Sequence, residues 1–331
     1  WLRPPLTSRS SCSPPDAVGA LAMSIGVLAD PNVVGALTMA PCQSAGTVCS
    51  QATDPDVRVG LDDEERRFSD IASAIASGRQ IPGWHVDERG IVSCPVEEDL
   101  FRDAKLVCSL LRSGFEPGGG SIDMYMCNRV IDPRRVKVQR RTLRRLSQQG
   151  NRPYVLRVDS AWDEVVRRIQ EHTWSYEPGD CWLSDDLSAS LKAARTSGEA
   201  RLLRVAFHCV ELWCGEELVA ANIGYTIGAI YSGFSKFYLR TDDKRYSGVG
   251  IMLSSALGAW LCRRGFKLYA MGQDAPYKSQ GVLRESYTIG VEQWLGEVRV
   301  ARGVADPPSI LPSDDAPILV QDLVARLDVE G

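Results

Sequence analysis

The chain has 331 residues, of which 44% are hydrophobic and 24% are charged, and its formal net charge is −4 at pH 7. This composition predicts a soluble globular protein with one large or two modest cores, and no stretch approaches the roughly 20 apolar residues that a membrane span needs. Ten cysteines are scattered without a Cys-x-x-Cys pair or a histidine cluster. A metal site or disulfide framework is therefore not expected, and a reducing, cytoplasmic location is predicted.

Residues 1–60 are predicted to form a disordered leader. They are rich in Ser, Pro, Ala and Gly, contain a single aromatic residue and show no sustained helical or strand period. The stretch from Val18 to Ala29 follows two arginines and can also be read as a signal or transit segment. Import into an organelle through this leader is therefore an alternative to a cytoplasmic location.

Residues 61–152 are predicted to form a smaller N-terminal domain. Apolar residues recur at three- and four-residue steps from Phe68 to Ile75 and from Asp99 to Arg112, as on one face of a helix. A glycine-rich turn from Glu116 to Gly120 then leads to a predicted strand over residues 122–126.

The segment 133–158 concentrates positive charge. It contains nine basic side chains and no Asp or Glu, so it carries +9 while the remainder of the chain carries −13. Such asymmetry indicates a polyanionic partner, and the absence of acids within the segment argues against internal pairing. We therefore interpret it as a phosphate-binding surface.

Strands and helices alternate over residues 153–304, which predicts a mixed α/β (α+β) domain. Strands are expected at 154–158, 202–213, 218–223, 229–239 and 266–271, and helices at 161–172, 187–196 and 249–263. Prolines after Val304 mark a linker. Residues 305–331 are predicted to form a tail with a short amphipathic helix from Ile318 to Leu327.

The order of motifs from Asp132 to Gly281 resembles the leucyl/phenylalanyl-tRNA–protein transferase family. Four anchors carry the resemblance: Asp132-Pro133-Arg134-Arg135-Val136 with the basic segment after it, Trp182 before a helix, His208-Cys209-Val210-Glu211-Leu212-Trp213 followed by Glu217-Leu218-Val219, and the glycine-containing stretches 224–228 and 233–237. The third anchor is the most specific, because a strand, a two-residue turn and a second strand match in register.

The resemblance implies a GNAT-like acyltransferase domain, in which a mixed sheet opens between two strands and the donor lies in the cleft. It implies an enzyme that moves Leu, Phe or Met from aminoacyl-tRNA to the N-terminal Arg or Lys of an acceptor protein, in N-terminal-residue-dependent protein degradation. Aminoacyl-tRNA is then the co-substrate, with no further cofactor and no metal. The implied protein is a monomer that binds neither DNA nor membranes.

Aminolysis of an aminoacyl ester needs a neutral α-amine, a donor for the developing oxyanion and reactants held in line. Because the reference pKa of an α-amine is about 7.7 to 8.0, one polar group that relays the proton is enough. The family carries an Asp-x-Gln pair at a strand end, where this chain has Tyr269 or Ala270 in place of the Asp. We predict Gln273 and Asp274, in the following loop, as shifted equivalents, with Ser235 as a further catalytic residue. Ordinary capping of the strand by these loop side chains is the alternative.

The predicted binding residues follow from the same resemblance. Phe234 replaces the family's Glu after Gly233, which puts amino-acid recognition in question, and Phe234 and Phe237 are predicted to line an apolar slot. Trp182 is expected to stack on terminal tRNA bases, at about 1 to 3 kcal/mol per base. Core packing is the alternative for these aromatic residues. The residues predicted to bind tRNA are Arg134, Arg135, Lys137, Arg140, Arg141, Arg144, Arg145 and Trp182.

A second motif indicates a different donor. Arg245-Tyr246-Ser247-Gly248-Val249-Gly250 fits the pattern with which acyl-CoA N-acyltransferases of the GNAT fold bind pyrophosphate at a helix N-terminus. Arg245, Gly248 and Gly250 would then bind acetyl-CoA. A catalytically inactive relative that binds RNA or peptide is a further alternative.

Overall fold

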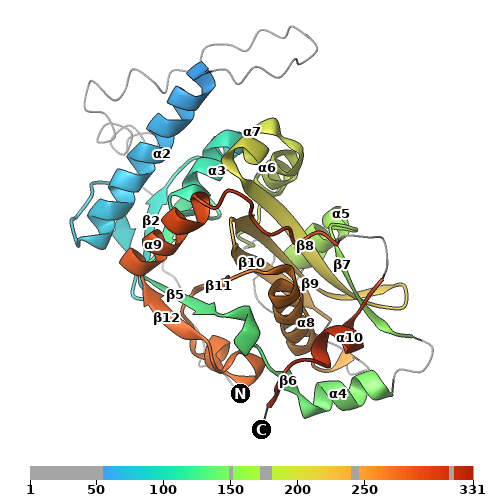
Figure 1. The fold of residues 1–331 in the computed structure, drawn as a ribbon. Helices are drawn as coiled ribbons and strands as arrows, with labels where there is room; N and C mark the ends of the chain where they lie inside the picture. The colour runs from blue at the N-terminus through green and yellow to red at the C-terminus, as the bar shows by residue number, and fades with distance from the viewer. Residues whose placement is uncertain (1–54, 149–151, 172–180, 240–245, 313–316, 331) are drawn as a thin grey trace, which may run out of the picture.

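The computed structural model describes residues 55–148, 152–171, 181–239, 246–312 and 317–330. The predicted leader lies outside these ranges up to residue 54. The first helix, α2, runs from Pro55 to Ala76 and so begins before the predicted start at residue 61. The mixed α/β architecture predicted from the sequence is confirmed (Figure 1).

An eight-stranded mixed sheet forms the centre of the molecule, with the order β12-β5-β11-β10-β9-β8-β7-β13. Its strands are β5 (Cys127–Ile131), β7 (Tyr154–Val158), β8 (Val205–Cys214), β9 (Glu217–Ile227), β10 (Ile230–Tyr238), β11 (Leu268–Gln273), β12 (Tyr287–Gly290) and β13 (Ile318–Leu319). Strands β8, β9 and β10 form an antiparallel meander. β9 is buried along nearly its whole length because helices cover both faces of the sheet.

Strands β10 and β11 form the parallel pair of this sheet and are joined by helix α8 (Val249–Arg264). Their pairing joins residues 230–232 to residues 268–270 and ends there, although β10 continues to Tyr238 and β11 to Gln273. Each strand has an irregularity just beyond this point, β10 between Gly233 and Ser235 and β11 between Ala270 and Gln273. Such irregularities bend strands, so the two strands separate at their carboxyl ends.

Helices pack on both faces of the sheet because successive residues of a strand point to opposite sides. On β8, Phe207 and Cys209 enter a core with α3 (Ala104–Arg112), α5 (Trp162–Gln170), α6 (Asp185–Thr196), α7 (Gly198–Leu203), α9 (Val291–Arg302) and α2. Val210 and Leu212 enter a second core with α8, α4 (Arg140–Ser147) and α10 (Val320–Val324). None of the helices in the described ranges is long and apolar enough to cross a membrane.

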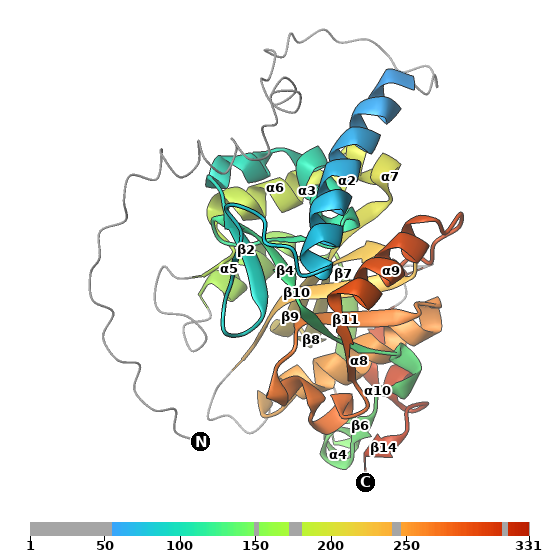
Figure 2. The same ribbon diagram turned by 90° about the vertical axis from the view of Figure 1, so that its left-hand side faces the viewer.

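Two smaller sheets complete the fold. One has the order β1 (His85–Val86), β2 (Ile91–Pro95), β4 (Ser121–Tyr125), β3 (Glu116–Pro117), and its strands β2 and β4 are labelled in Figure 2. Its apolar side chains share the core with α3. The other pairs β6 (Val138–Gln139) with β14 (Val329–Glu330). Short 3-10 turns are η2 (Glu98–Arg102), η3 (Pro133–Arg135), η5 (Pro276–Ser279) and η6 (Gly281–Leu283).

Several predicted boundaries were wrong. The helix expected over 99–112 is divided into η2 and α3, because the Asp103 side chain accepts from the amides of Lys105 and Leu106 and starts a new helix. The strand expected from Leu202 begins three residues later, because Leu202 belongs to α7. Gln273 is the last residue of β11 and does not lie in the following loop.

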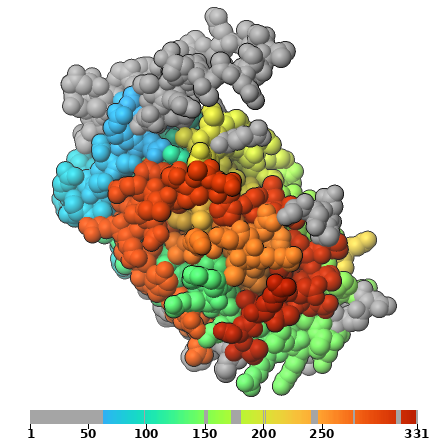
Figure 3. Space-filling view, in the orientation of Figure 1, coloured from blue at the N-terminus to red at the C-terminus, as the bar shows by residue number. Residues whose placement is uncertain are grey.

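The C-terminal residues contain more secondary structure than the predicted tail with one short helix. The helix expected from Ile318 to Leu327 is reduced to α10, with β13 before it and β14 after it. Val320 and Val324 are buried in the second core, and α10 contacts α4. The space-filling view shows the C-terminal residues, in red, against the green surface that includes α4 (Figure 3). β5, which precedes the expected domain boundary at residue 152, also belongs to the main sheet.

Helix α8 approaches the segment of η3 closely through Gly258. A Cβ atom at this position would lie 2.6–2.7 Å from three carbon atoms of Val136. We predict that Gly258→Ala destabilises the protein by about 1 to 3 kcal/mol through overpacking.

The matched control is Gly296→Ala in α9, where a Cβ would have no neighbour within 4 Å. That change is expected to be neutral or to stabilise by up to about 1 kcal/mol, because Ala favours helix more than Gly. Urea unfolding of both variants measures the difference, and equal effects would contradict the packing account.

Candidate functional site

A group of polar side chains lies where β10 and β11 stop pairing. The carboxylate of Glu116, on β3, accepts hydrogen bonds from the Tyr225 hydroxyl at 3.2 Å and from the Ser232 hydroxyl at 3.3 Å. Ser232 is the last residue of β10 that pairs with β11. We call Glu116, Tyr125, Tyr225, Ser232 and Lys278 the cleft cluster.

Burial dominates the electrostatics of Glu116. It raises the pKa of this carboxyl to about 7, although hydrogen bonds from Tyr125, Tyr225 and Ser232 favour the charged form. Burial also raises the pKa of both tyrosines well above the ordinary value, so they remain hydrogen-bond donors. Glu116 can therefore gain and lose a proton near neutral pH.

Lys278, in η5, is coupled electrostatically to Glu116. Its Nζ atom donates to the backbone carbonyl of Met271 at 2.6 Å and to that of Gln273 at 2.8 Å. Both carbonyls belong to the part of β11 that no longer pairs with β10. Burial lowers the pKa of Lys278 to about 8, the attraction of Glu116 raises it, and the positive charge of Lys236 lowers it further.

Aromatic residues lead from the cleft cluster toward the glycine run of residues 118–120. The rings of Tyr225 and Phe234 are 4.8 Å apart, and those of Phe234 and Trp182 are 5.9 Å apart. A Cβ at Gly119 would lie 3.1 Å from the Trp182 backbone, so the glycine permits this close approach. Of the predicted pocket residues, Phe234 is half-buried in this aromatic row and Phe237 is buried in the core.

The predicted catalytic residues lie at the carboxyl ends of β10 and β11. The amide of Gln273 donates to the Arg89 carbonyl at 3.2 Å, and Ser235 accepts from Asn222 through its backbone carbonyl. The carboxylate of Asp274 pairs with Arg129 at 2.7 Å and accepts from Thr288 at 2.7 Å. Burial raises the pKa of Asp274, but these partners lower it below the ordinary value. The catalytic role of the three residues stays a prediction.

Helix α4 presents the predicted tRNA-binding arginines. Thr142 and Leu146 are buried, and the opposite face exposes Arg140, Arg141 and Arg144. Its polar face is therefore a compact basic surface.

Not every basic residue of the segment is free to bind a phosphate. Arg134 pairs with Asp132, and Lys137 pairs with Glu285. The argument against internal pairing was wrong for these two residues, because their partners come from outside residues 133–158. Arg135 is exposed, and Arg145 is half-buried.

The predicted CoA loop adjoins this basic surface. Arg141 donates to the Ser247 hydroxyl at 2.7 Å, and the Arg145 guanidinium lies 3.7 Å from the place of a Cβ at Gly248. Gly248 precedes α8 with a φ of 80°, and a Cβ at Gly250 would lie 2.9 Å from the Tyr238 ring. Both glycines thus have a conformational or packing role. Arg245 lies outside the described residues.

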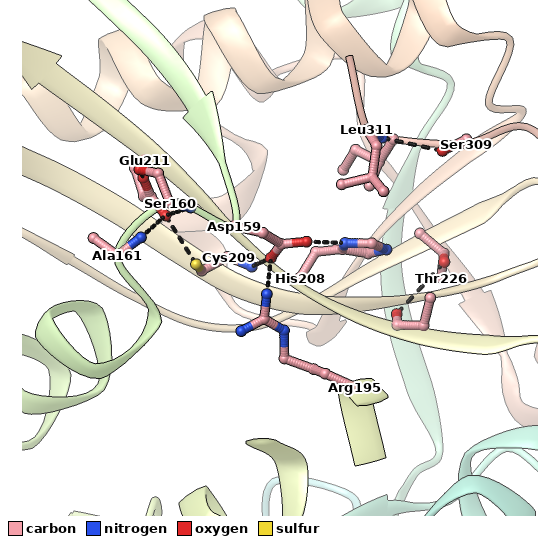
Figure 4. Close-up of polar contacts among 12 residues, drawn as sticks. Asp159, Ser160, Ala161, Arg195, His208, Cys209, Glu211, Thr226, Ser309 and Leu311 are labelled. Carbon is pink, nitrogen blue, oxygen red and sulfur yellow. Dashed lines mark hydrogen bonds and ion pairs between the residues drawn. The ribbon is translucent and has the colours of Figure 1, made fainter. Parts of the chain in front are cut away.

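The motif His208 to Trp213 on β8 has a structural role (Figure 4). The fully buried Glu211 carboxylate accepts from the amides of Ser160 and Ala161, at 2.8 and 2.9 Å, just before α5. It also accepts from the Trp213 indole at 3.1 Å. His208 is also buried, and its Nδ1 lies 2.8 Å from the Asp159 carboxylate, so it is a satisfied core residue.

Comparison with known proteins identifies the class of the central part of the chain. Residues 130–269 match the family model described as leucyl/phenylalanyl-tRNA protein transferase. This part of the chain is therefore similar to that family. The match includes the basic helix α4, the motif strand β8, the paired part of β10 and the first two residues of β11, but it ends before Gln273 and Asp274.

Particular relatives carry the name leucyl/phenylalanyl-tRNA–protein transferase. The protein from Proteus mirabilis (strain HI4320) is 29% identical over 105 residues, which are 32% of this chain and 40% of that protein. The protein from Cupriavidus metallidurans is 26% identical over 181 residues, covering 52% and 66%, and that from Caulobacter vibrioides is 30% identical over 112 residues, covering 33% and 46%. The chain thus spans about half the length of the curated relatives it matches.

A solved structure of a conserved protein of unknown function from Bacteroides thetaiotaomicron VPI-5482 has a TM-score of 0.32 and 9% identity. It covers 55% of this chain and 57% of that one, and we draw nothing from it. In the described ranges, no group of three or more His, Cys, Asp or Glu side chains is placed to hold a metal ion.

Sequence reasoning missed Glu116 and Lys278. Both lie outside the residues that match the family model. The available signal for Glu116 was a single acid between Phe115 and Pro117, four residues after the end of a helix with a strongly apolar face. Lys278 gave no such signal, because only the fold brings η5 to the end of β11.

The buried carboxyl predicts a pH dependence of stability. Because the pKa of Glu116 is raised from 4.5 to about 7, the folded protein binds an extra proton between these values. The stability from this group is therefore full at low pH and falls as pH rises from about 4.5 through 7, by up to about 3 kcal/mol. In Glu116→Gln this loss should be absent, as measured by urea unfolding at pH 5 and pH 8.

Glu216→Gln is the matched control, because Glu216 is exposed in the β8–β9 turn and should leave the pH dependence unchanged. The account of Glu116 fails if Glu116→Gln loses as much stability between pH 5 and pH 8 as the wild type does.

Proposed function

We propose that this protein transfers an amino acid from aminoacyl-tRNA to the N-terminal α-amine of an acceptor protein. The match of residues 130–269 to the transferase family carries this proposal. Leu and Phe are the proposed donor amino acids, with Met as a further one, and N-terminal Arg or Lys marks the proposed acceptor. The product would enter N-terminal-residue-dependent degradation.

The arrangement of α4 and α8 supports this proposal. Arg141 contacts Ser247, and Gly250 packs on Tyr238, the last residue of β10. The basic surface therefore adjoins the end of β10 that has separated from β11. Phosphates of tRNA held on α4 would place the acceptor end near this opening, where Trp182 and Phe234 offer aromatic faces.

The remaining features of the proposal follow from the family. The protein would act in the cytoplasm as a monomer, with aminoacyl-tRNA and an acceptor protein as partners and without DNA, membrane, metal or a further cofactor. The opening between β10 and β11 would hold the aminoacyl end, as in a GNAT-like acyltransferase.

A direct transfer assay tests the proposed activity. The purified protein is incubated with radiolabelled Leu-, Phe- or Met-tRNA and a peptide that begins with Arg. We expect label to pass to this peptide and not to the same peptide with an acetylated N-terminus, because the acetylated nitrogen is no nucleophile. Absence of transfer from all three tRNAs would contradict the proposal.

The basic surface predicts a salt-dependent interaction with tRNA. Replacing Arg140, Arg141 and Arg144 with Ala should weaken tRNA binding by more than about tenfold at low salt, because phosphate contacts release counterions. The slope of log K against log salt should become shallower by about 2 to 3. Filter binding or fluorescence anisotropy measures both quantities.

A variant of equal charge provides the control. Arg66, Arg79 and Arg299 are exposed elsewhere on the molecule, and their replacement with Ala should change the affinity and the slope much less. Equal effects in both variants would show a general effect of net charge and would contradict a binding surface on α4.

CoA-dependent acyl transfer is the second candidate function. The observation that favours it is Gly248, whose left-handed backbone starts the 16-residue helix α8. Acetyl-CoA with the same Arg peptide is the parallel reaction. Acetylation without aminoacyl transfer would make this loop the site, and neither reaction would favour an inactive relative that binds RNA or peptide.

A further inference from the structure

The positions of the family's Asp-x-Gln pair carry neither a carboxylate nor an amide side chain in this chain. Tyr269 or Ala270 stands where the Asp is expected, so Met271 or Gly272 stands where the Gln would follow. Ala270 is the last residue of β11 that pairs with β10, and Gly272 lies just beyond it. The opening between the strands therefore lacks the expected polar pair on β11 itself.

Two other ionisable groups occupy this place. Lys278 Nζ binds the carbonyls of Met271 and Gln273, on both sides of Gly272. The Tyr125 ring lies 3.3 Å from the place of a Cβ at Gly272. Tyr125 also hydrogen-bonds to Glu116, so this one side chain contacts both Gly272 and the carboxylate.

We propose that Glu116 and Lys278 form the proton-transfer pair of this site, with Glu116 as the base and Lys278 as the acid. This inference rests on the proposed aminoacyl transfer. It assigns the proton transfers to side chains from β3 and η5, which lie where β10 and β11 stop pairing.

Hydroxyl and carbonyl groups contact both side chains. Glu116 accepts from hydroxyls, and Lys278 donates to backbone carbonyls. A structural ion pair would keep the carboxyl pKa low and the ammonium pKa high. Here burial moves the two values toward each other, to about 7 and about 8, where each group exchanges a proton near neutral pH.

The proposed step balances without a further reactant. The nitrogen of the acceptor α-amine attacks the ester carbonyl carbon, the C–N bond forms, and the nitrogen gives a proton to the Glu116 carboxylate. As the bond between the carbonyl carbon and the ribose oxygen breaks, that oxygen takes a proton from the Lys278 ammonium. The products are a peptide amide and a tRNA with a free hydroxyl. Transfer of the proton from Glu116 to Lys278 restores the starting state.

Other charged or titratable groups surround the pair and contribute to its titration. They are Asp123 and Tyr125 on β4, Arg129 on β5, Tyr225 on β9, Lys236 on β10 and Asp274 after β11. In the transfer reaction, kcat should rise with pH as Glu116 ionises near 7 and fall as Lys278 loses its proton near 8. The neutral fraction of the α-amine adds to the rise.

Kinetics of transfer from Leu-tRNA to an Arg peptide test the pair. Glu116→Gln should lower kcat by about 10²- to 10⁴-fold, leave KM for both substrates nearly unchanged and remove the rise near pH 7. Glu116→Asp should recover part of the rate. Lys278→Met should lower kcat and remove the fall near pH 8, which gives a second and independent readout.

The controls are Glu216→Gln and Lys267→Met, which change exposed residues outside the cluster and should keep the wild-type rate and profile. Near-UV circular dichroism and tRNA affinity show whether each variant is folded. If the wild type transfers but folded Glu116→Gln keeps its rate and pH profile, the pair is refuted while the transferase function stands. If the wild type transfers nothing, the transferase function and the pair both fail.

Discussion

The early end of the pairing between β10 and β11 is the constraint on which the site depends. Parallel strands joined by a helix normally pair along their length, but here bulges in both strands stop the ladder at Ser232 and Ala270. The carbonyls of β11 freed in this way need donors, and the Lys278 ammonium supplies them. The buried Glu116 carboxylate attracts this ammonium. The early end of the pairing thus explains an unusual pair of ionisable groups.

Two sequence features that resemble the transferase family, the motif of β8 and the basic segment, serve different purposes in this architecture. The motif of β8 acts through Glu211, which fixes the start of α5, and its residues support the fold. The basic segment forms the exposed face of α4 and contacts the loop before α8, which is close to the end of β10. The protein can therefore bind a polyanion on α4 while a reaction takes place at the opening between β10 and β11, because the two places are close together.

The sequence predicted those parts of the fold that are set by local patterns. The strands β8, β9 and β10 and the helix α8 follow, within a few residues, from apolar periodicity and turn residues. The position of β5 between β11 and β12 did not, because this pairing joins residues more than a hundred positions apart. For the same reason the cleft cluster was invisible: Glu116, Ser232 and Lys278 meet only in three dimensions. Lys137 and Glu285 likewise pair over a long sequence distance.

The central claim is that the opening between β10 and β11 holds the aminoacyl end of tRNA. A crystal structure with a non-hydrolysable, amide-linked aminoacyl-adenosine tests it most directly. The account predicts the ligand in this opening, with its base near Trp182 and its carbonyl carbon beside Glu116 and Lys278. A ligand bound at another surface, with Glu116 and Lys278 enclosed by protein alone, would contradict the account.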